Sequence, residues 1–233
     1  LDAFSEYVKS KAYISEVIIK FYTSEKTLVE AYQAGDVDAI NSISSEQADI
    51  LSKDGANIIQ GSLPRVFAIF FNQSANPVLA RSEVREALSL AVDRNAIVGT
   101  ILKDFATPLD KPVPKSFTTS VDSSSTTLAG TTQNARAILD KNGWTLNASG
   151  IREKIIGKDT VPLAFSISTS DAAELKDVAE MLKTQWRTLG AEVTVKVVEG
   201  GYLNQNVIKP RKYDALLFGH VVNRELDLYA FWH

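Results

Sequence analysis

The chain's clearest pattern is VPLAFSISTS (161–170), DAAELKDVAEMLKTQWRTLG (171–190) and AEVTVKVVEG (191–200). In the first segment Leu163, Phe165 and Ile167 alternate with small or polar residues, and in the third Val193, Val195 and Val197 do the same; both patterns indicate strands. Between them, apolar residues recur at helical spacing over Ala172–Leu189, and Gly190 closes the helix. This strand–helix–strand unit predicts two parallel strands joined by a right-handed crossover.

Similar patterns on both sides predict the remaining elements. The predicted helices are one that Ser24 caps and Gly35 ends, Ser45–Lys53, one that Ser82 caps, Asn95–Lys103, Thr132–Asn142 and Tyr202–Ile208. The predicted strands are Glu16–Tyr22, Val37–Ile40, Asn57–Gly61, Arg65–Asn72 (buried on both faces), Ile151–Ile156 paired as a hairpin with Val161–Ser168, and Tyr213–Phe218. Residues 104–131 are expected to form a surface loop. The fold class is therefore α/β, a mixed sheet flanked by helices.

The bulk composition argues against several classes of function. The 233 residues carry a formal net charge of -3, with no basic face for nucleic acid, and no apolar run is long enough to span a bilayer. Cys is absent, which excludes disulfides and thiolate chemistry. The chain begins at Leu1 with neither an initiator Met nor a leader pattern, so it is interpreted as a processed or excised piece.

The sequence contains no recognisable catalytic or metal-binding motif. The only His residues are His220 and His233, and no HExxH, GxSxG or Walker A pattern occurs. Gly157-Lys158-Asp159 is interpreted as a hairpin turn and not as a phosphate loop. The chain is therefore expected to be no enzyme and to need no cofactor and no metal.

Two strand ends are candidates for ligand contacts, because ligands of open α/β sheets lie outside the carboxyl ends of the strands. One is Ser168-Thr169-Ser170, where the next helix also presents its amino terminus. The other is Gly219-His220-Val221-Val222-Asn223. If the two strands are neighbours, both ends line one edge of the same crevice. The alternative for His220 is a loop residue with no special role.

Several segments in series resemble the extracellular solute-binding proteins, family 5, which serve oligopeptide, dipeptide and nickel ABC importers. The segments are Glu16–Tyr22 with Leu28–Asp38, Phe70–Asn72 with Val84–Arg94, Ala135–Trp144 with Gly150–Lys154, and Tyr213–Leu217 with Asp227–His233. The second is the most specific. Within it, Arg85 is interpreted as a structural residue and not as a ligand contact.

The resemblance implies a lobe of the type II periplasmic-binding-protein-like fold, in a fragment of a longer protein. Residues 1–62 would be the end of a discontinuous first lobe, and residues 63–233 most of the second. It implies an extracytoplasmic protein that captures a peptide or similar small solute between two lobes. Its partners would be an ABC permease and, through a lipid anchor outside this chain, the membrane.

The resemblance also marks a departure from the family pattern. Peptide-binding members hold the peptide's α-amino group with an Asp at the position of about Val222, with Asn223 next, and their following Asp-Pro is Glu225-Leu226 here. A ligand without a free amino group is therefore favoured. Two other functions stay open: a ligand sensor of the same fold that serves no transporter, and an α/β hydrolase or transferase whose site the sequence does not reveal.

Overall fold

The computed structural model describes residues 1–4, 6, 12–61, 63, 65–109 and 132–221. The chain divides into two compact units, Leu1–Ile58 and Ile59–His233. This division lies close to the predicted lobe boundary at residue 62, and the assignment of each unit to a lobe stays a prediction. No helix of the described ranges is long and apolar enough to cross a membrane.

The first unit contains the two helices that the sequence predicts there, α1 (Glu25–Gln33) and α2 (Ser45–Lys53). The Ser24 hydroxyl caps α1 by accepting from the Thr27 N–H at 3.2 Å, and Ser44 caps α2 in the same way through Gln47. Val29 of α1 and Leu51 of α2 are buried. The Ser44 N–H donates in turn to the Glu25 carboxylate, which ties the start of α2 to the start of α1.

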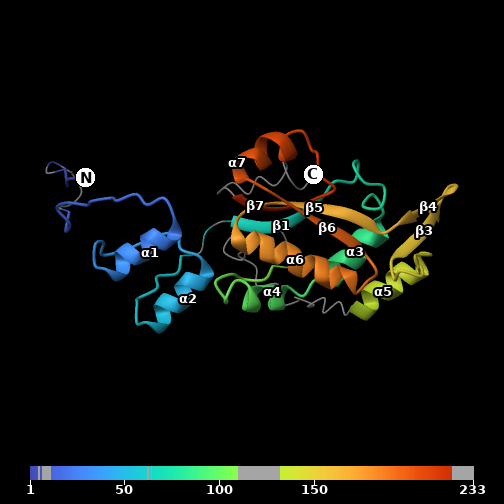
Figure 1. Cartoon of the computed structure of the whole chain (residues 1–233), viewed down its shortest axis with the longest axis horizontal. Coiled ribbons are helices and arrows are strands. Elements are labelled where there is room, and N and C mark those ends of the chain that lie inside the picture. The colour runs from blue at the N-terminus through green and yellow to red at the C-terminus, as the bar shows by residue number, and fades with distance from the viewer. Residues whose placement is uncertain (5, 7–11, 62, 64, 110–131, 222–233) are drawn as a thin grey trace. The chain divides into compact units, whose positions relative to one another are not determined.

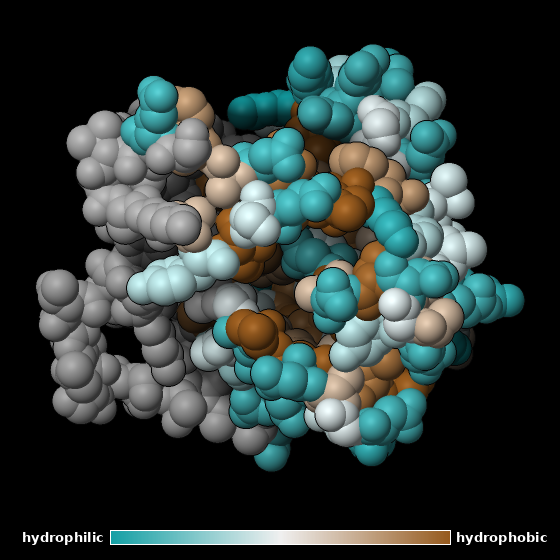
Figure 2. Space-filling view, turned by 90° about the vertical axis from the view of Figure 1, so that its left-hand side faces the viewer, coloured by the Kyte–Doolittle hydropathy of each residue, from teal (hydrophilic) through white to brown (hydrophobic). Residues whose placement is uncertain are grey.

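The three strands predicted for the first unit are wrong. Residues 16–22, 37–40 and 57–61 form no strand, and only an isolated bridge joins Glu16 to Asp2. The apolar alternation at 16–22 is real, but Val17, Ile19 and Phe21 are 45%, 59% and 92% exposed. A strand needs a partner along its length, and among the described residues of this unit only the bridge at Asp2 provides one. Figure 2 shows hydrophobic residues at the surface among hydrophilic ones.

The second unit is built on a four-stranded sheet in the order β1 (Arg65–Phe71), β7 (Ala215–Val221), β5 (Ala164–Ser170) and β6 (Glu192–Val198). β1 and β7 are antiparallel, whereas β5 lies parallel to both β7 and β6 (Figure 1). Helix α6 (Ala173–Arg187) connects β5 to β6. The mixed sheet and its parallel strand–helix–strand unit are therefore confirmed.

Helices cover both faces of this sheet. On one face α6 packs with α3 (Ser82–Leu90), α4 (Arg94–Thr100) and α5 (Thr132–Lys141) around the main core. In that core the rings of Phe165 and Trp186 lie 5.5 Å apart, and the Trp186 indole donates to the Leu88 carbonyl at 2.9 Å. On the other face, α7 (Gly200–Tyr202) and a π-helix, η2 (Leu203–Ile208), pack Leu203 and Val207 against Leu216.

A second, three-stranded sheet contains β2 (Thr145–Leu146), β3 (Arg152–Ile156) and β4 (Asp159–Pro162). The predicted hairpin turn at Gly157 is confirmed, but its predicted second strand, Val161–Ser168, is wrong. That segment is divided at Leu163, whose N–H donates to the Arg152 carbonyl while its own carbonyl accepts from Glu192. The chain therefore crosses here from the small sheet to the large one, and β5 begins at Ala164.

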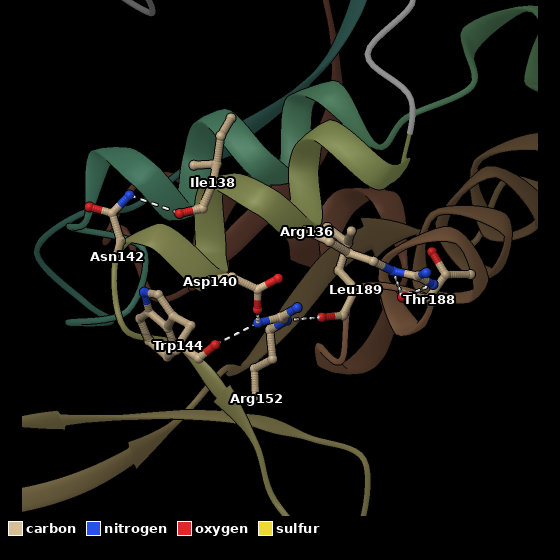
Figure 3. Close-up of polar contacts among 8 residues, drawn as sticks. All are labelled: Arg136, Ile138, Asp140, Asn142, Trp144, Arg152, Thr188 and Leu189. Atoms are coloured by element: carbon tan, nitrogen blue, oxygen red, sulfur yellow. Dashed lines mark hydrogen bonds and ion pairs between the residues drawn. The ribbon is translucent and has the colours of Figure 1, made fainter.

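Arg152 joins the two sheets to the helices around them (Figure 3). Its side chain is only 4% exposed, and its guanidinium donates to the Leu189 carbonyl, the Trp144 carbonyl and the Asp140 carboxylate. Gly190 has a φ of +84°, and a Cβ at this position would lie 2.9 Å from Arg152 Cγ. The close approach of the α6 terminus to Arg152 therefore requires glycine here.

The predictions for Ser82, Arg85 and the loop at 104–131 remain to be compared with the structure. Ser82 is the first residue of α3, and the cap position belongs to Arg81, which makes no side-chain cap. The Arg85 guanidinium donates to the carbonyls of Leu79 and Ala80 at 2.9 Å, which confirms its structural role. Residues 110–131 of the predicted loop lie outside the described residues.

Candidate ligand-contact edge

The parallel arrangement brings the carboxyl ends of three strands to one edge of the large sheet. β5 ends there at Ser170, β6 at Val198 and β7 at Val221. Because β1 is antiparallel to β7, it begins at the same edge, with Arg65 opposite Val221. β5 and β7 are thus neighbours, which was the condition for their two ends to line a common edge.

The first candidate segment lies mostly inside the sheet. Ser168 and Thr169 are 4% and 0% exposed, and the Thr169 hydroxyl donates to the Leu217 carbonyl of β7 at 3.1 Å. Only Ser170, which is half-buried, stands at the strand end. Ser168 and Thr169 are therefore part of the buried sheet, whereas Ser170 lies at its edge, and a ligand contact of Ser170 stays a prediction.

The second candidate segment is the end of strand β7 and not the loop after it. Gly219 lies opposite Phe67 of β1, His220 opposite Val66 and Val221 opposite Arg65. Successive residues of a strand face opposite sides, so His220 lies on the other face of the sheet from Gly219 and Val221. His220 is half-buried and Val221 is 48% exposed. Val222 and Asn223 lie outside the described residues.

An aromatic contact that the sequence did not predict occupies this edge. The Phe67 ring lies so close over Gly219 that a Cβ there would be 2.6 Å from Phe67 Cε1. Phe67 itself is 54% exposed, which corrects the expectation that its strand is buried on both faces, and the Arg65 guanidinium lies 6.0 Å from its ring centroid. A sequence signal for this exposure was present. Arg65 and Phe67 are two residues apart, so they share one face of β1, and the charge of Arg65 keeps that face near solvent.

This edge brings apolar and polar groups together. Phe67 and Val221 expose apolar surface, Ser170 and His220 carry a hydroxyl and a half-buried imidazole, and Arg65 carries a cation. The amino terminus of α6 begins three residues after β5 ends, at Ala173. Within the described ranges, no group of three His, Cys, Asp or Glu residues could hold a metal ion.

A carboxylate with a shifted pKa, Glu83, lies in another part of the second unit, between α3 and the small sheet. Glu83 accepts from Lys154 at 3.2 Å, and both side chains are largely buried. Burial raises the pKa of Glu83, but its own backbone N–H, the Lys154 ammonium and the nearby Trp144 indole together lower it below its ordinary value of 4.5. On the outer face of the small sheet, Thr145, Glu153, Ile155 and Thr160 line an open groove of about 420 Å³. No predicted site residue lies at either place.

The comparisons with known proteins agree with this architecture. The family model of bacterial extracellular solute-binding proteins, family 5 (middle part), matches residues 1–232. The oligopeptide-binding protein AppA of Bacillus subtilis is 24% identical over 239 residues, which cover 100% of this chain and 43% of AppA. The chain thus spans less than half the length of this curated relative.

Solved structures share the fold at low sequence identity. NikA from Brucella suis, in complex with Fe(III)-EDTA, superposes with a TM-score of 0.79 at 23% identity, covering 97% of this chain and 45% of NikA. AppA from Bacillus subtilis, in complex with a nonapeptide, gives 0.70 at 23% identity and covers 84% and 39%. NikZ from Campylobacter jejuni, in complex with Ni(L-His), gives 0.72 at 23% identity and covers 91% and 41%.

These likenesses confirm the fold class, a mixed α/β lobe of the type II periplasmic-binding-protein kind. The family match covers nearly every residue, including the first unit, whose helices were predicted correctly and whose strands were not. This chain belongs to the bacterial extracellular solute-binding proteins of family 5.

Proposed function

We propose that the protein is the extracytoplasmic substrate-binding component of an ABC importer, which captures a peptide or a similar small solute between two lobes and catalyses no reaction. The family match over residues 1–232 is the observation that carries this proposal. The edge of the large sheet supports it, because it offers apolar and polar contacts together, as small-molecule sites do. A lipid anchor outside these residues would hold the protein at the outer face of the membrane.

In this proposal the carboxyl edge of β5 and β7 forms one wall of the ligand site. Ser170, Gly219, His220 and Val221 would contact the solute, with Val222 and Asn223 beyond them in the sequence, and Ser168 and Thr169 would hold the edge in place. Phe67 would add an aromatic surface beside the Arg65 cation. The residue at about Val222 is no carboxylate, so the solute's recognition would not depend on a free α-amino group there.

A thermal-shift screen of the full-length protein tests the proposal. Free-amino peptides, the same peptides with acetylated amino termini, and a nickel–histidine complex are compared; the complex is included because NikZ holds Ni(L-His). A binding solute should raise the melting temperature as its concentration rises. Equal stabilisation by a peptide and its acetylated form is the expected pattern. If no solute stabilises the protein while it turns over some substrate, a hydrolase or transferase function replaces this one.

A transport assay separates an importer component from a ligand sensor of the same fold. Uptake of the labelled solute should fall when the gene is deleted and return when it is restored. Unchanged uptake, with binding intact, would favour the sensor. Cell fractionation tests the location, which the proposal places outside the cytoplasm.

A further inference from the structure

The dipeptide Asn142-Gly143 is the chain's single Asn-Gly pair. In this pair the glycine amide nitrogen can attack the preceding side-chain carbonyl, because glycine has no side chain to hinder the approach. Attack of Gly143 N on Asn142 Cγ forms an N–Cγ bond and breaks the Cγ–Nδ2 bond, and ammonia leaves with the amide proton. Water then opens the succinimide at either carbonyl, which gives an aspartyl or an isoaspartyl residue. The net reaction consumes one water and releases one ammonia.

The fold holds both reacting groups away from this reaction. The Asn142 side chain reaches back along α5 and donates from Nδ2 to the Ile138 carbonyl at 2.8 Å (Figure 3). The attacking nitrogen of Gly143 donates its proton to the Asp140 carbonyl at 3.0 Å. Gly143 also has a φ of +80°, the left-handed conformation that ends the helix. Each of these contacts must break before the nitrogen can reach Cγ.

The product would not fit the place that Asn142 occupies. An aspartate there loses the donor to Ile138 and puts a negative charge at the carboxyl end of α5, where the helix dipole opposes it. An isoaspartyl link lengthens the backbone just before Trp144, whose N–H bonds to Leu139 and whose carbonyl accepts from Arg152. Once modified, the helix end could not re-form the same contacts.

We propose that Asn142 is a latent deamidation site which the hydrogen bonds at the end of α5 keep closed, so that the rate of modification there follows the fraction of molecules in which this helix end is open. Opening is local, because the Asn142 side chain is exposed while Leu139 and Trp144 beside it are buried. The proposal concerns the chain's own chemistry and does not depend on the ligand.

Peptide mapping by mass spectrometry tests it on the full-length protein at mildly alkaline pH, folded and in urea. Trypsin releases residues 142–152, which contain Asn142 and also Asn147, followed by Ala148. Fragment ions therefore measure both asparagines in one peptide, and Asn147 is the internal control. In urea the gain of one mass unit should appear at Asn142 first. Folding should slow it about tenfold or more, because reaction must wait for local opening.

The substitution Arg152→Lys provides a second measurement. It loosens the contacts that hold Trp144 and Asp140, so it should speed modification at Asn142 in the folded protein and leave the rate in urea unchanged. Equal rates for the folded and unfolded wild-type protein would overturn the proposal. Faster modification at Asn147 than at Asn142 in urea would overturn it as well.

Discussion

Gly219 shows how one missing side chain shapes the candidate edge. Its lack of a Cβ lets the Phe67 ring lie against β7, with ring carbons 2.6–3.0 Å from where that Cβ would be. The ring thereby covers one face of the β1–β7 pair, and His220 lies on the opposite face. The glycine at position 219, which lets the ring approach the backbone, thus determines that the Phe67 ring lies at this edge.

The substitution Gly219→Ala should displace the Phe67 ring. Because the ring is half exposed and can rotate outward, the cost should be modest, about 1 kcal/mol of unfolding free energy. Urea titration measures it, and the double variant with Phe67→Ala is the control, since it has no ring to displace. The same loss in the Phe67→Ala background would show that the ring contact is not the cause.

Glu83 carries a charge that stabilises the fold. Its folded pKa lies below the ordinary value of 4.5, so ionisation stabilises the folded state above that pH. This stabilisation is lost as the pH falls through the lower, folded pKa. Burial opposes this lowering of the pKa, and the backbone N–H of Glu83 and the Lys154 ammonium at 3.2 Å outweigh it.

The substitution Glu83→Gln should lower the unfolding free energy at pH 7 by about 1–2 kcal/mol, because it leaves the half-buried Lys154 ammonium without its counter-charge. The difference from the wild type should shrink as the pH is lowered below 4.5. Glu180→Gln, which breaks the exposed pair with Lys183, is the matched control and should cost about 0–0.5 kcal/mol. A difference that does not change with pH would mean that packing, and not charge, explains Glu83.

At the scale of elements, helices and the buried parallel unit could be predicted, because their signals are local. Ser45–Lys53 matches α2 residue for residue, and the apolar spacing of α6 gave its buried face. The strand at Glu16–Tyr22 could not be judged in this way, since alternation says nothing of whether a partner is present. The division at Leu163 was also hidden, because the alternating pattern continues from Val161 to Ile167 without a Gly or a turn signal at Leu163.

The candidate site could be predicted only in part, because the sequence does not show which distant strands pair. The pattern of residues 161–200 predicted the parallel pairing of β5 with β6, whereas the adjacency of β5 and β7 was a condition, which the structure meets. Ser170 and the end of β7 could be named because ligands of open α/β sheets lie outside the carboxyl ends of the strands. Thr169 is buried because β5 lies beside β7, and Phe67 lies at the edge because β1 is the other neighbour of β7. That neighbour, β1, is more than 140 residues away in sequence, at Arg65–Phe71.

The carboxyl end of α6 is held by two arginines of different kinds. Arg152 is buried and donates to three groups, whereas Arg136 is exposed and, among the described residues, donates to the Thr188 carbonyl alone. Both satisfy carbonyls that the helix itself leaves without partners. Their different burial predicts very different costs of removal.

The substitution Arg152→Lys should cost about 2–4 kcal/mol of unfolding free energy, because an ammonium cannot replace a planar guanidinium that bonds in several directions inside the protein. Arg136→Lys, the exposed counterpart, should cost about 0–1 kcal/mol. Urea titration of the two variants beside the wild type measures both. Similar losses for the two would show that Arg152 does not join the sheets as described.

At the scale of the whole molecule, the two units differ in how much core they contain. Every residue of the two hydrophobic clusters belongs to the second unit, from Val78 to Leu217. The first unit buries Val29 and Leu51 but exposes Ile18, Ile19 and Phe21. Large exposed apolar side chains close together in sequence are typical of a surface that something else covers.

Hydrogen exchange on the chain of residues 1–233 should therefore show two levels of protection. Amides of α1 and α2 should exchange at least about a hundredfold faster than those of β5 and α6, because few buried contacts oppose their opening. In the full-length protein the protection of α1 and α2 should rise if further chain covers the apolar residues at 16–22. Equal protection of both units in the 1–233 chain would contradict the division.

Ligand affinity should also depend on the part of the full-length protein outside residues 1–233. In the proposed site the edge at Ser170 and Val221 is one wall, and such sites gain affinity by burying most of the solute's surface. The chain of residues 1–233 should therefore bind any solute of the full-length protein at least about a hundredfold more weakly. The loss of about half of the ligand contacts lowers the affinity by several factors of ten. Calorimetry with the solute found by thermal shift compares the two forms. Low-micromolar binding by residues 1–233 alone would show instead that this edge, with Phe67 and Arg65, already forms a complete site.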